Sequence, residues 1–261
     1  DGARRPRRRR GGGGLGVSLG GAFGRYVSDL REKGLDVVFV VDGTASMQDV
    51  IDAVRRDLGA LVDTLQSMVP VARIGFVVYR DRDDDKPIEM APLTASRKKL
   101  DAFLKGIRAE GGGDWPESLN LGIGAAWEKM SWRPGAKRLI VFVASSPPHD
   151  DEREPTIALA HQVRDAGGAV SAVDLSAAMH EAFEREFAKS MHGREPDAIT
   201  PLPGFYREVE ATFGEIVAAG GGELIELHQN DALVKHLLVL AFGTRWKEEV
   251  KALAQAARPR D

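Results

Sequence analysis

Four continuous apolar runs, separated by helical patterns, constrain the fold of this chain more than any other feature. The runs are DVVFVV, ARIGFVVY, RLIVFVA and AVSAVD, which begin at residues 36, 72, 138 and 169. An apolar run without alternation is typical of a strand that is buried on both faces of a sheet. Between the first two runs, apolar residues recur with helical spacing from Met47 to Leu65. This alternation predicts an α/β domain with a doubly wound, mostly parallel sheet.

The rest of the chain adds an edge strand and further helices. The run PIEMAPL at 87–93 follows the acidic loop RDRDDD and predicts an antiparallel edge strand that is reached through a hairpin. The segment ELIEL predicts one more strand, and GGGDWPE is expected to open a helix. Other helices are predicted at 22–33, 100–107, 155–166, 206–219, 231–241 and 245–256.

We divide the chain into four segments. Residues 1–21 are interpreted as a disordered Arg- and Gly-rich tail or linker, because they carry too few apolar side chains to bury. A short N-terminal helix is expected at 22–34. The main α/β domain is expected at 35–243, with an irregular insertion at 176–204 that holds one helix and a loop. A C-terminal helix and tail follow at 244–261. The chain begins with Asp rather than Met, so we expect a trimmed chain or a fragment.

Composition excludes several classes of protein. The absence of Cys rules out disulfides, thiol catalysis and zinc sites built on Cys. A net charge of −3 over 261 residues gives no signature of a polyanion-binding protein. No apolar run approaches the roughly 18–20 residues that span a bilayer. The sequence does not decide the compartment. An exported, extracytoplasmic location is favoured, with no leader visible in the chain.

The first apolar run ends in DGTASM, which places Asp42, Thr44 and Ser46 at alternate positions. One interpretation is phosphoryl transfer, because haloacid-dehalogenase-type phosphatases carry Asp-x-Asp-Gly-Thr at the end of a strand. The position of their aspartyl nucleophile is occupied here by Val40, so the attacking atom is missing. The other interpretation is a divalent metal. Three oxygens with this spacing at a strand-to-helix turn can face one point, and hard cations prefer oxygen ligands.

Each candidate ligand also has a structural explanation. Ser46 and Asp49 have the spacing of a helix capping box, although Asp replaces the usual Glu. Thr44 could bond the backbone of the turn. Asp114 and Glu117 have the spacing of a second capping box. The sequence of the turn alone therefore does not decide between a metal site and helix caps.

Several segments, taken in order, resemble the von Willebrand factor type A domain family, whose metal-ion-dependent adhesion site begins with Asp-x-Ser/Thr-x-Ser after the first strand. RIGFVVYRDRDD looks like the second strand and the loop of many bacterial members, and GGGDWPESLNLGIGAAW resembles the second site loop. KRLIVFVASSPPHD resembles the fourth strand and third site loop, and FGEIVAAGGGELIEL resembles the late helix and strand. The resemblance covers about residues 35–243 and implies a Rossmann-like three-layer sandwich with one antiparallel edge strand.

The resemblance implies a metal site formed by three loops. The first loop would supply three ligands, Asp42, Thr44 and Ser46. In the second loop, Trp115 stands where the family usually has Thr, which makes Asp114 the nearest oxygen donor. In the third loop, Ser145 replaces the usual Asp. Each missing ligand weakens the attraction for a cation, so we expect weak binding of Mg²⁺, or of Mn²⁺ or Ca²⁺.

The resemblance also implies a non-catalytic protein-binding module, in which the metal coordinates an Asp or Glu side chain of a partner protein. Asp81, Asp150 or Asp151 could compensate for the carboxylate that is missing from the third loop. Two alternatives stay open. One is a metal-free scaffold that binds through the loops at 81–87 and 145–155. The other is a metal-assisted hydrolase, for which the sequence offers no general base paired with a nucleophile. No nucleic-acid partner is expected, and the oligomeric state is not predicted.

Overall fold

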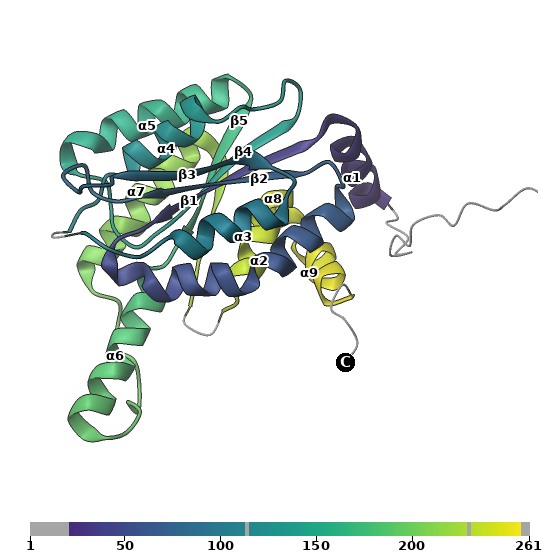
Figure 1. Cartoon of the computed structure of the whole chain (residues 1–261). Coiled ribbons are helices and arrows are strands. Elements are labelled where there is room, and N and C mark those ends of the chain that lie inside the picture. The colour runs from purple at the N-terminus through teal and green to yellow at the C-terminus, as the bar shows by residue number, and fades with distance from the viewer. Residues whose placement is uncertain (1–20, 113–114, 229–230, 257–261) are drawn as a thin grey trace, which may run out of the picture.

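The computed structural model describes residues 21–112, 115–228 and 231–256, which form a six-stranded sheet with helices on both faces (Figure 1). The strand order is β3-β2-β1-β4-β5-β6. β3 runs antiparallel to β2 at one edge, and the other neighbouring strands are parallel. The predicted doubly wound α/β fold with an antiparallel edge strand is therefore confirmed.

Strands and helices alternate along the chain. The strands are β1 (Leu35–Asp42), β2 (Arg73–Tyr79), β3 (Ile88–Thr94), β4 (Lys137–Ala144), β5 (Gly168–Asp174) and β6 (Gly221–Glu226). The α-helices are α1 (Gly21–Lys33), α2 (Gln48–Met68), α3 (Arg97–Gly106), α4 (Leu119–Lys129), α5 (Asp150–Asp165), α6 (Ser176–His192), α7 (Gly204–Gly220), α8 (Leu233–Phe242) and α9 (Lys247–Ala256). Short 3-10 helices, η1 (Ala45–Met47) and η2 (Thr244–Trp246), precede α2 and α9. Within the described ranges, no helix has the length and hydropathy needed to cross a membrane.

Two predicted helix starts are corrected by the structure. α5 begins at Asp150, five residues before its predicted start, and its first turn carries three acidic residues. Negative charges stabilise a helix at this end because they face the positive end of its dipole. α4 begins only at Leu119, with Ser118 as its N-cap. Glu117 therefore precedes the helix and does not close a capping box inside its first turn.

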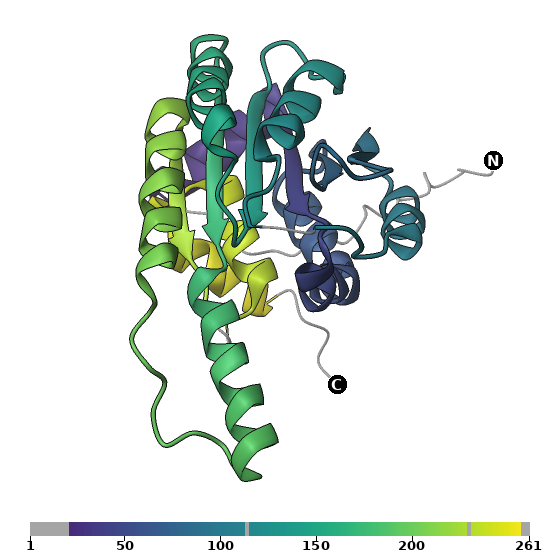
Figure 2. The same cartoon turned by 90° about the vertical axis from the view of Figure 1, so that its left-hand side faces the viewer.

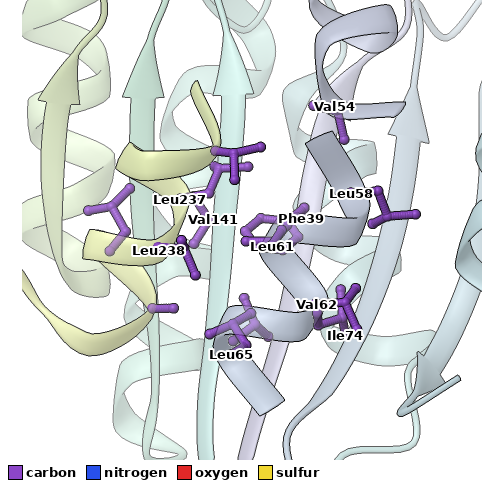
Figure 3. Packing of buried hydrophobic residues seen from close by; sticks show 14 of the residues in the cluster. Phe39, Val54, Leu58, Leu61, Val62, Leu65, Ile74, Val141, Leu237 and Leu238 are labelled. Atoms are coloured by element: carbon purple, nitrogen blue, oxygen red, sulfur yellow. The ribbon is translucent and has the colours of Figure 1, made fainter. Parts of the chain in front are cut away.

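Side chains that alternate along the strands build two cores, one on each face of the sheet. On β1, Val37, Phe39 and Val41 pack with α2, α3 and α8, whereas Val38 and Val40 pack with α4, α5 and α7. Figure 3 shows part of the first core, where side chains of α2 and α8 meet strands β1, β2 and β4. Burial of both faces explains why the strands are continuous apolar runs in the sequence.

The helix α6 extends away from the body of the domain, as both Figure 1 and Figure 2 show. This helix has 17 residues and begins the segment 176–204, which was predicted as an irregular insertion with one helix and a loop. Phe183, Phe187 and Met191 are 64%, 54% and 62% exposed, respectively. Because residues four apart lie on the same side of a helix, they form one apolar stripe. Exposed apolar patches of this kind mark interaction surfaces.

Candidate metal centre

The parallel strands bring four polar residues together at their carboxyl ends. Asp42 ends β1 and Asp174 ends β5, while Asp81 and Ser145 lie just beyond β2 and β4. The register between β1 and β2 places Asp42 directly beside Tyr79. Ligands of open α/β sheets bind at the carboxyl ends of the strands. The sequence-predicted site residues of the first and third loops therefore lie where the fold class binds its ligands.

The turn after β1 brings Asp42, Thr44 and Ser46 together. The Oδ1 atom of Asp42 accepts hydrogen bonds from the backbone N–H of Thr44 at 2.9 Å and from its hydroxyl at 2.7 Å. The hydroxyl oxygens of Thr44 and Ser46 are 3.5 Å apart. The N-cap residue of α2 is Met47, and no side chain caps that helix. The capping box considered for Ser46 and Asp49 is therefore absent.

Gly43, between the first two candidate ligands, is required by a close approach of β2. A Cβ atom at this position would lie 2.4 Å from Cγ1 of Val78, a distance at which the surrounding atoms would have to shift. The N–H of Gly43 donates to the carbonyl of Tyr79 at 2.7 Å. The Asp-Gly-Thr order thus combines a candidate ligand, a residue without a side chain and a second candidate ligand in one turn.

The second carboxylate oxygen of Asp42, Oδ2, is buried and has no hydrogen-bond partner in the described part of the chain. Burial raises the pKa of Asp42 to about 6, although hydrogen bonds from Thr44 and the charge of Arg80 act to lower it. Between the usual Asp pKa near 4 and about 6, the folded state binds more protons than the unfolded state, so stability falls as pH rises. Ionisation of Asp42 therefore lowers the free energy of unfolding.

The oxygens of this turn fit a hard divalent cation. Ligands of octahedral Mg²⁺ lie about 2.1 Å from the ion, which puts neighbouring ligand oxygens roughly 3 Å apart. The separation of 3.5 Å between the hydroxyl oxygens of Thr44 and Ser46 is close to that value. The Thr44 hydroxyl donates a hydrogen bond to Oδ1 of Asp42, which leaves its oxygen with lone-pair capacity to face an ion. A buried carboxylate oxygen without a donor is a natural third ligand.

The loop between α3 and α4 is hydrogen-bonded to the first loop through backbone groups. The N–H of Glu110 donates to the carbonyl of Gly43 at 3.1 Å, and the N–H of Ala45 donates to the carbonyl of Gly111 at 3.3 Å. Asp114, the predicted ligand of this loop, lies outside the described residues. The backbone pairing nevertheless shows that the first and second loops form one unit at the edge of the sheet.

Glu117 is a carboxylate of the second loop. Its position in the sequence predicted only a role in a helix cap. Its side chain is buried, at 3% exposure. A Cβ atom on Gly112 would lie 2.7 Å from Cβ of Thr44 and 2.8 Å from Oε1 of Glu117, so this glycine brings both residues near one point. Burial, followed by the charges of Asp42 and Glu117, raises the pKa of Tyr79 well above its usual value. A second carboxylate therefore belongs to the surroundings of Asp42.

Arg80 is a second buried residue that the sequence did not reveal. It is 1% exposed and lies directly after β2. Its guanidinium donates to the carbonyl of Arg108 at 2.7 Å and pairs with Glu89 at 2.9 Å. Its positive charge acts to lower the pKa of Asp42. Arg80 therefore offsets part of the negative charge that the loops gather at this edge.

Asp81 is held by the loops around it. Its Oδ1 atom accepts hydrogen bonds from Nε2 of His149 at 2.6 Å, from the hydroxyl of Ser118 at 3.0 Å and from the N–H of Arg82 at 2.8 Å. Burial alone would raise the pKa of Asp81, but these bonds together hold it below the usual value. Asp151 pairs with Arg82 at 2.8 Å. Of the three carboxylates predicted as substitutes for the third-loop ligand, Asp81 and Asp151 therefore have partners outside the first loop.

The third loop joins the second through its backbone. The N–H of Glu117 donates to the carbonyl of Pro147 at 3.0 Å. Ser145, the predicted third-loop residue, is buried at 3% exposure just after β4. Asp150 is exposed at the start of α5. Within the described ranges, no group of three or more His, Asp or Glu side chains is arranged to hold a metal. Among the described residues, the candidate centre therefore consists of the Asp42 carboxylate and hydroxyl oxygens.

An exposed aromatic cluster borders the second loop. The ring of Trp115 lies 5.5 Å from that of Phe205 and 5.6 Å from that of Tyr206, centroid to centroid. Trp115 is 40% exposed and Phe205 is 49% exposed. In the sequence, Trp115 indicates only the position of a missing ligand. Phe205 and Tyr206 lie in the first turn of α7, far from Trp115 in the sequence, so only the fold brings the three rings together.

Comparisons with known proteins place these loops in a family. A family model described as von Willebrand factor type A domain matches residues 36–198. An alpha-protein kinase vwkA of Dictyostelium discoideum is 30% identical over 122 residues, which cover 45% of this chain and 19% of that protein. The chain thus spans about a fifth of the length of that relative.

Solved structures share the fold. BatB, a conserved hypothetical protein of Bacteroides thetaiotaomicron, matches with a TM-score of 0.55 at 17% identity, over 85% of this chain and 100% of that one. The pilus adhesin SpaC of Lactobacillus rhamnosus GG matches with a TM-score of 0.54 at 13% identity, over 86% of this chain and 30% of that one. The family match over more than half of the chain, on the sheet and loops described above, shows that the chain belongs to the von Willebrand factor type A domain family.

Proposed function

We propose that the domain is a protein-binding module that uses a divalent cation at Asp42 to coordinate an Asp or Glu side chain of a partner protein. The observation that carries the proposal is the buried Oδ2 atom of Asp42, which has no partner among the described residues and shares its turn with two hydroxyl oxygens. Domains of this family are generally interaction modules, and one protein of similar fold is named a pilus adhesin.

The first loop would hold Mg²⁺, or Mn²⁺ in its place, through Asp42, Thr44 and Ser46. When bound, the ion supplies an electrophilic point for an incoming carboxylate. One carboxylate and two neutral oxygens do not neutralise a divalent charge, and octahedral coordination leaves positions for other ligands. Asp114 and Ser145 remain part of the proposal as contributors from the second and third loops. Glu117 adds a nearby carboxylate, which strengthens the field that attracts a cation.

The proposed binding surface includes apolar side chains as well as the ion. Trp115 and Phe205 are exposed on the loop and helix that border the site. Large aromatic residues dominate the energetics of many protein interfaces. The apolar stripe of α6, which includes Phe183 and Phe187, continues outward from the same edge of the sheet. These features favour a protein partner over a small carboxylic acid.

We propose no catalytic role for the domain. The hydroxyl of Ser118 donates to Asp81, and His149 also bonds to Asp81. A serine hydrolase needs the hydroxyl to bond to the imidazole, which then takes its proton. The kinase activity in the name of one relative belongs to a protein of which this chain covers 19%. The described geometry therefore supports binding rather than group transfer.

The open coordination positions can be tested with Mn²⁺ and water-proton relaxation. Protein-bound Mn²⁺ is expected to enhance the relaxation rate, because water fills the positions that the first loop leaves free. Adding a short peptide with one Glu and an amidated C-terminus should lower this enhancement, since the Glu carboxylate displaces water. The matched peptide with Gln in place of Glu should have little effect. Equal effects of the two peptides would contradict carboxylate coordination, and the absence of any bound Mn²⁺ would favour a metal-free scaffold.

A further inference from the structure

A groove of about 620 Å³ lies between α2, α8 and α9. It is lined by the second half of α2, whereas the candidate metal centre lies before the start of that helix. Its floor is formed by Val234, Leu238 and Val250, which are all buried. Figure 3 shows Leu238 beside the core side chains of α2. Sites for small molecules typically have volumes of about 300–1,000 Å³ and apolar walls.

Small residues create the hollow above this floor. Gly59 and Ala60 line it from α2, and Ala254 lines it from α9. A Cβ atom on Gly59 would lie 2.3 Å from Nη2 of Arg97, so the glycine lets this guanidinium lie against α2. There Arg97 pairs with Asp63 at 3.0 Å. The glycine therefore leaves room for a cation at the rim of an apolar groove.

The rim of the groove carries more positive than negative charge. Four cations come from four different helices and surround two carboxylates, namely Arg56, Arg97, Lys235 and Lys251 around Asp57 and Asp63. Arg97 has a close ion pair with Asp63, whereas the pairs of Arg56 with Asp57 and of Lys251 with Glu248 are long, at 3.9 Å and 3.8 Å. Lys235 is exposed and has no ion pair with any described residue. It also lies in the first turn of α8, where the helix dipole adds positive potential.

We propose that this groove binds an amphiphilic anion, a small molecule with an apolar body and one acidic head group. The apolar body would cover the floor at Leu238 and Val250, and the head group would meet the excess positive charge near Lys235. Burial of apolar area supplies affinity, while the cations select for an anion. The site uses none of the residues of the proposed metal centre and is independent of it.

The proposal can be tested with 1-anilinonaphthalene-8-sulfonate, whose body is apolar and whose head is a single sulfonate. Its uncharged counterpart, N-phenyl-1-naphthylamine, has the same aromatic body. The full chain is expected to bind the sulfonate at one saturable site and more tightly than the amine. The double substitution Lys235→Glu and Lys251→Glu should weaken sulfonate binding by at least about tenfold and change amine binding much less.

Two further variants complete the test. Ala60→Trp should weaken binding of both dyes, because Ala60 is an exposed wall residue and a larger side chain fills the groove without entering the core. The matched control, Lys105→Glu with Lys129→Glu, makes the same change in net charge outside the groove and should leave both affinities unchanged. Circular dichroism confirms that each variant is folded. Equal affinity for the two dyes, or sulfonate binding that survives the reversal at Lys235 and Lys251, would overturn the proposal.

Discussion

Replacing Asp42 with Ala is expected to reduce the affinity for Mn²⁺ by at least about a hundredfold, because ligand charge tunes sites of this type over several decades. Asp42 supplies the charged ligand of the first loop, and its Oδ2 atom is the buried oxygen that lacks a donor. Isothermal titration of Mn²⁺ into wild type and variant measures the loss. Since ligands bind metals in their deprotonated form, wild-type affinity should also rise as pH increases through about 6, the pKa of Asp42.

The same variant should remain folded. Burial raises the pKa of Asp42, so its ionised form weakens the native state, and removing the carboxylate removes that effect. Asp49→Ala is the matched control, because Asp49 is an exposed carboxylate in the first turn of α2 and its removal changes the net charge equally. The affinity of this control variant for Mn²⁺ should equal that of wild type. Equal Mn²⁺ binding by a folded Asp42→Ala variant and wild type would show that the first loop does not hold the metal.

Replacing Asp36 with Ala is expected to lower the free energy of unfolding by about 3 kcal/mol, at the lower end of the range for breaking a buried ion pair. Asp36 is fully buried in β1. Arg73 donates to it from Nε at 3.0 Å and from Nη2 at 2.6 Å, and Arg133 donates from Nη2 at 2.6 Å. The backbone N–H of Arg133 donates at 2.9 Å. The variant leaves these donors without their acceptor, although both guanidinium groups are partly exposed and can recover some hydration.

The contribution of Asp36 should depend on pH. Burial alone would raise the pKa of Asp36, but hydrogen bonds from Arg73 and Arg133 outweigh it and hold the pKa below its usual value. The stabilisation is therefore complete above the unfolded pKa of about 4 and is lost as pH falls through the lower folded value. Urea unfolding at pH 7 and pH 3 measures this difference. Asp29→Ala removes an exposed i,i+4 pair with Lys33 and should change stability little. A similarly small change for Asp36→Ala would contradict this account.

The sheet could be predicted from the sequence because its central strands are buried on both faces. Continuous apolar runs such as the one that ends at Asp42 distinguish such strands from helices and from half-exposed strands. Helix starts were harder to predict. The acidic residues that follow Pro148 look like a surface loop in the sequence, yet they form the first turn of α5, where their charges face the helix dipole.

Only the part of the candidate centre that lies within one short segment could be predicted from the sequence. Asp42, Thr44 and Ser46 share one turn, so their spacing indicates that their oxygens can meet. The position of Glu117 near Thr44 depends on the close approach of two loops at Gly112, and the aromatic cluster joins Trp115 to α7. Such contacts arise from packing between distant segments, which a single sequence does not show. The likeness of RIGFVVYRDRDD to bacterial members of the family, which would make the domain a bacterial-type one, and the extracytoplasmic location stay predictions.

The most direct test of the central claim is an anomalous difference map from crystals of the protein soaked in Mn²⁺. We expect a peak within about 2.3 Å of the Asp42 carboxylate, with Thr44 and Ser46 as neighbouring ligands, because the ion would be bound by oxygens. A solvent molecule or a carboxylate from another protein molecule should complete the coordination. A map with no peak at Asp42, or with its peak bound to other residues, would contradict the account.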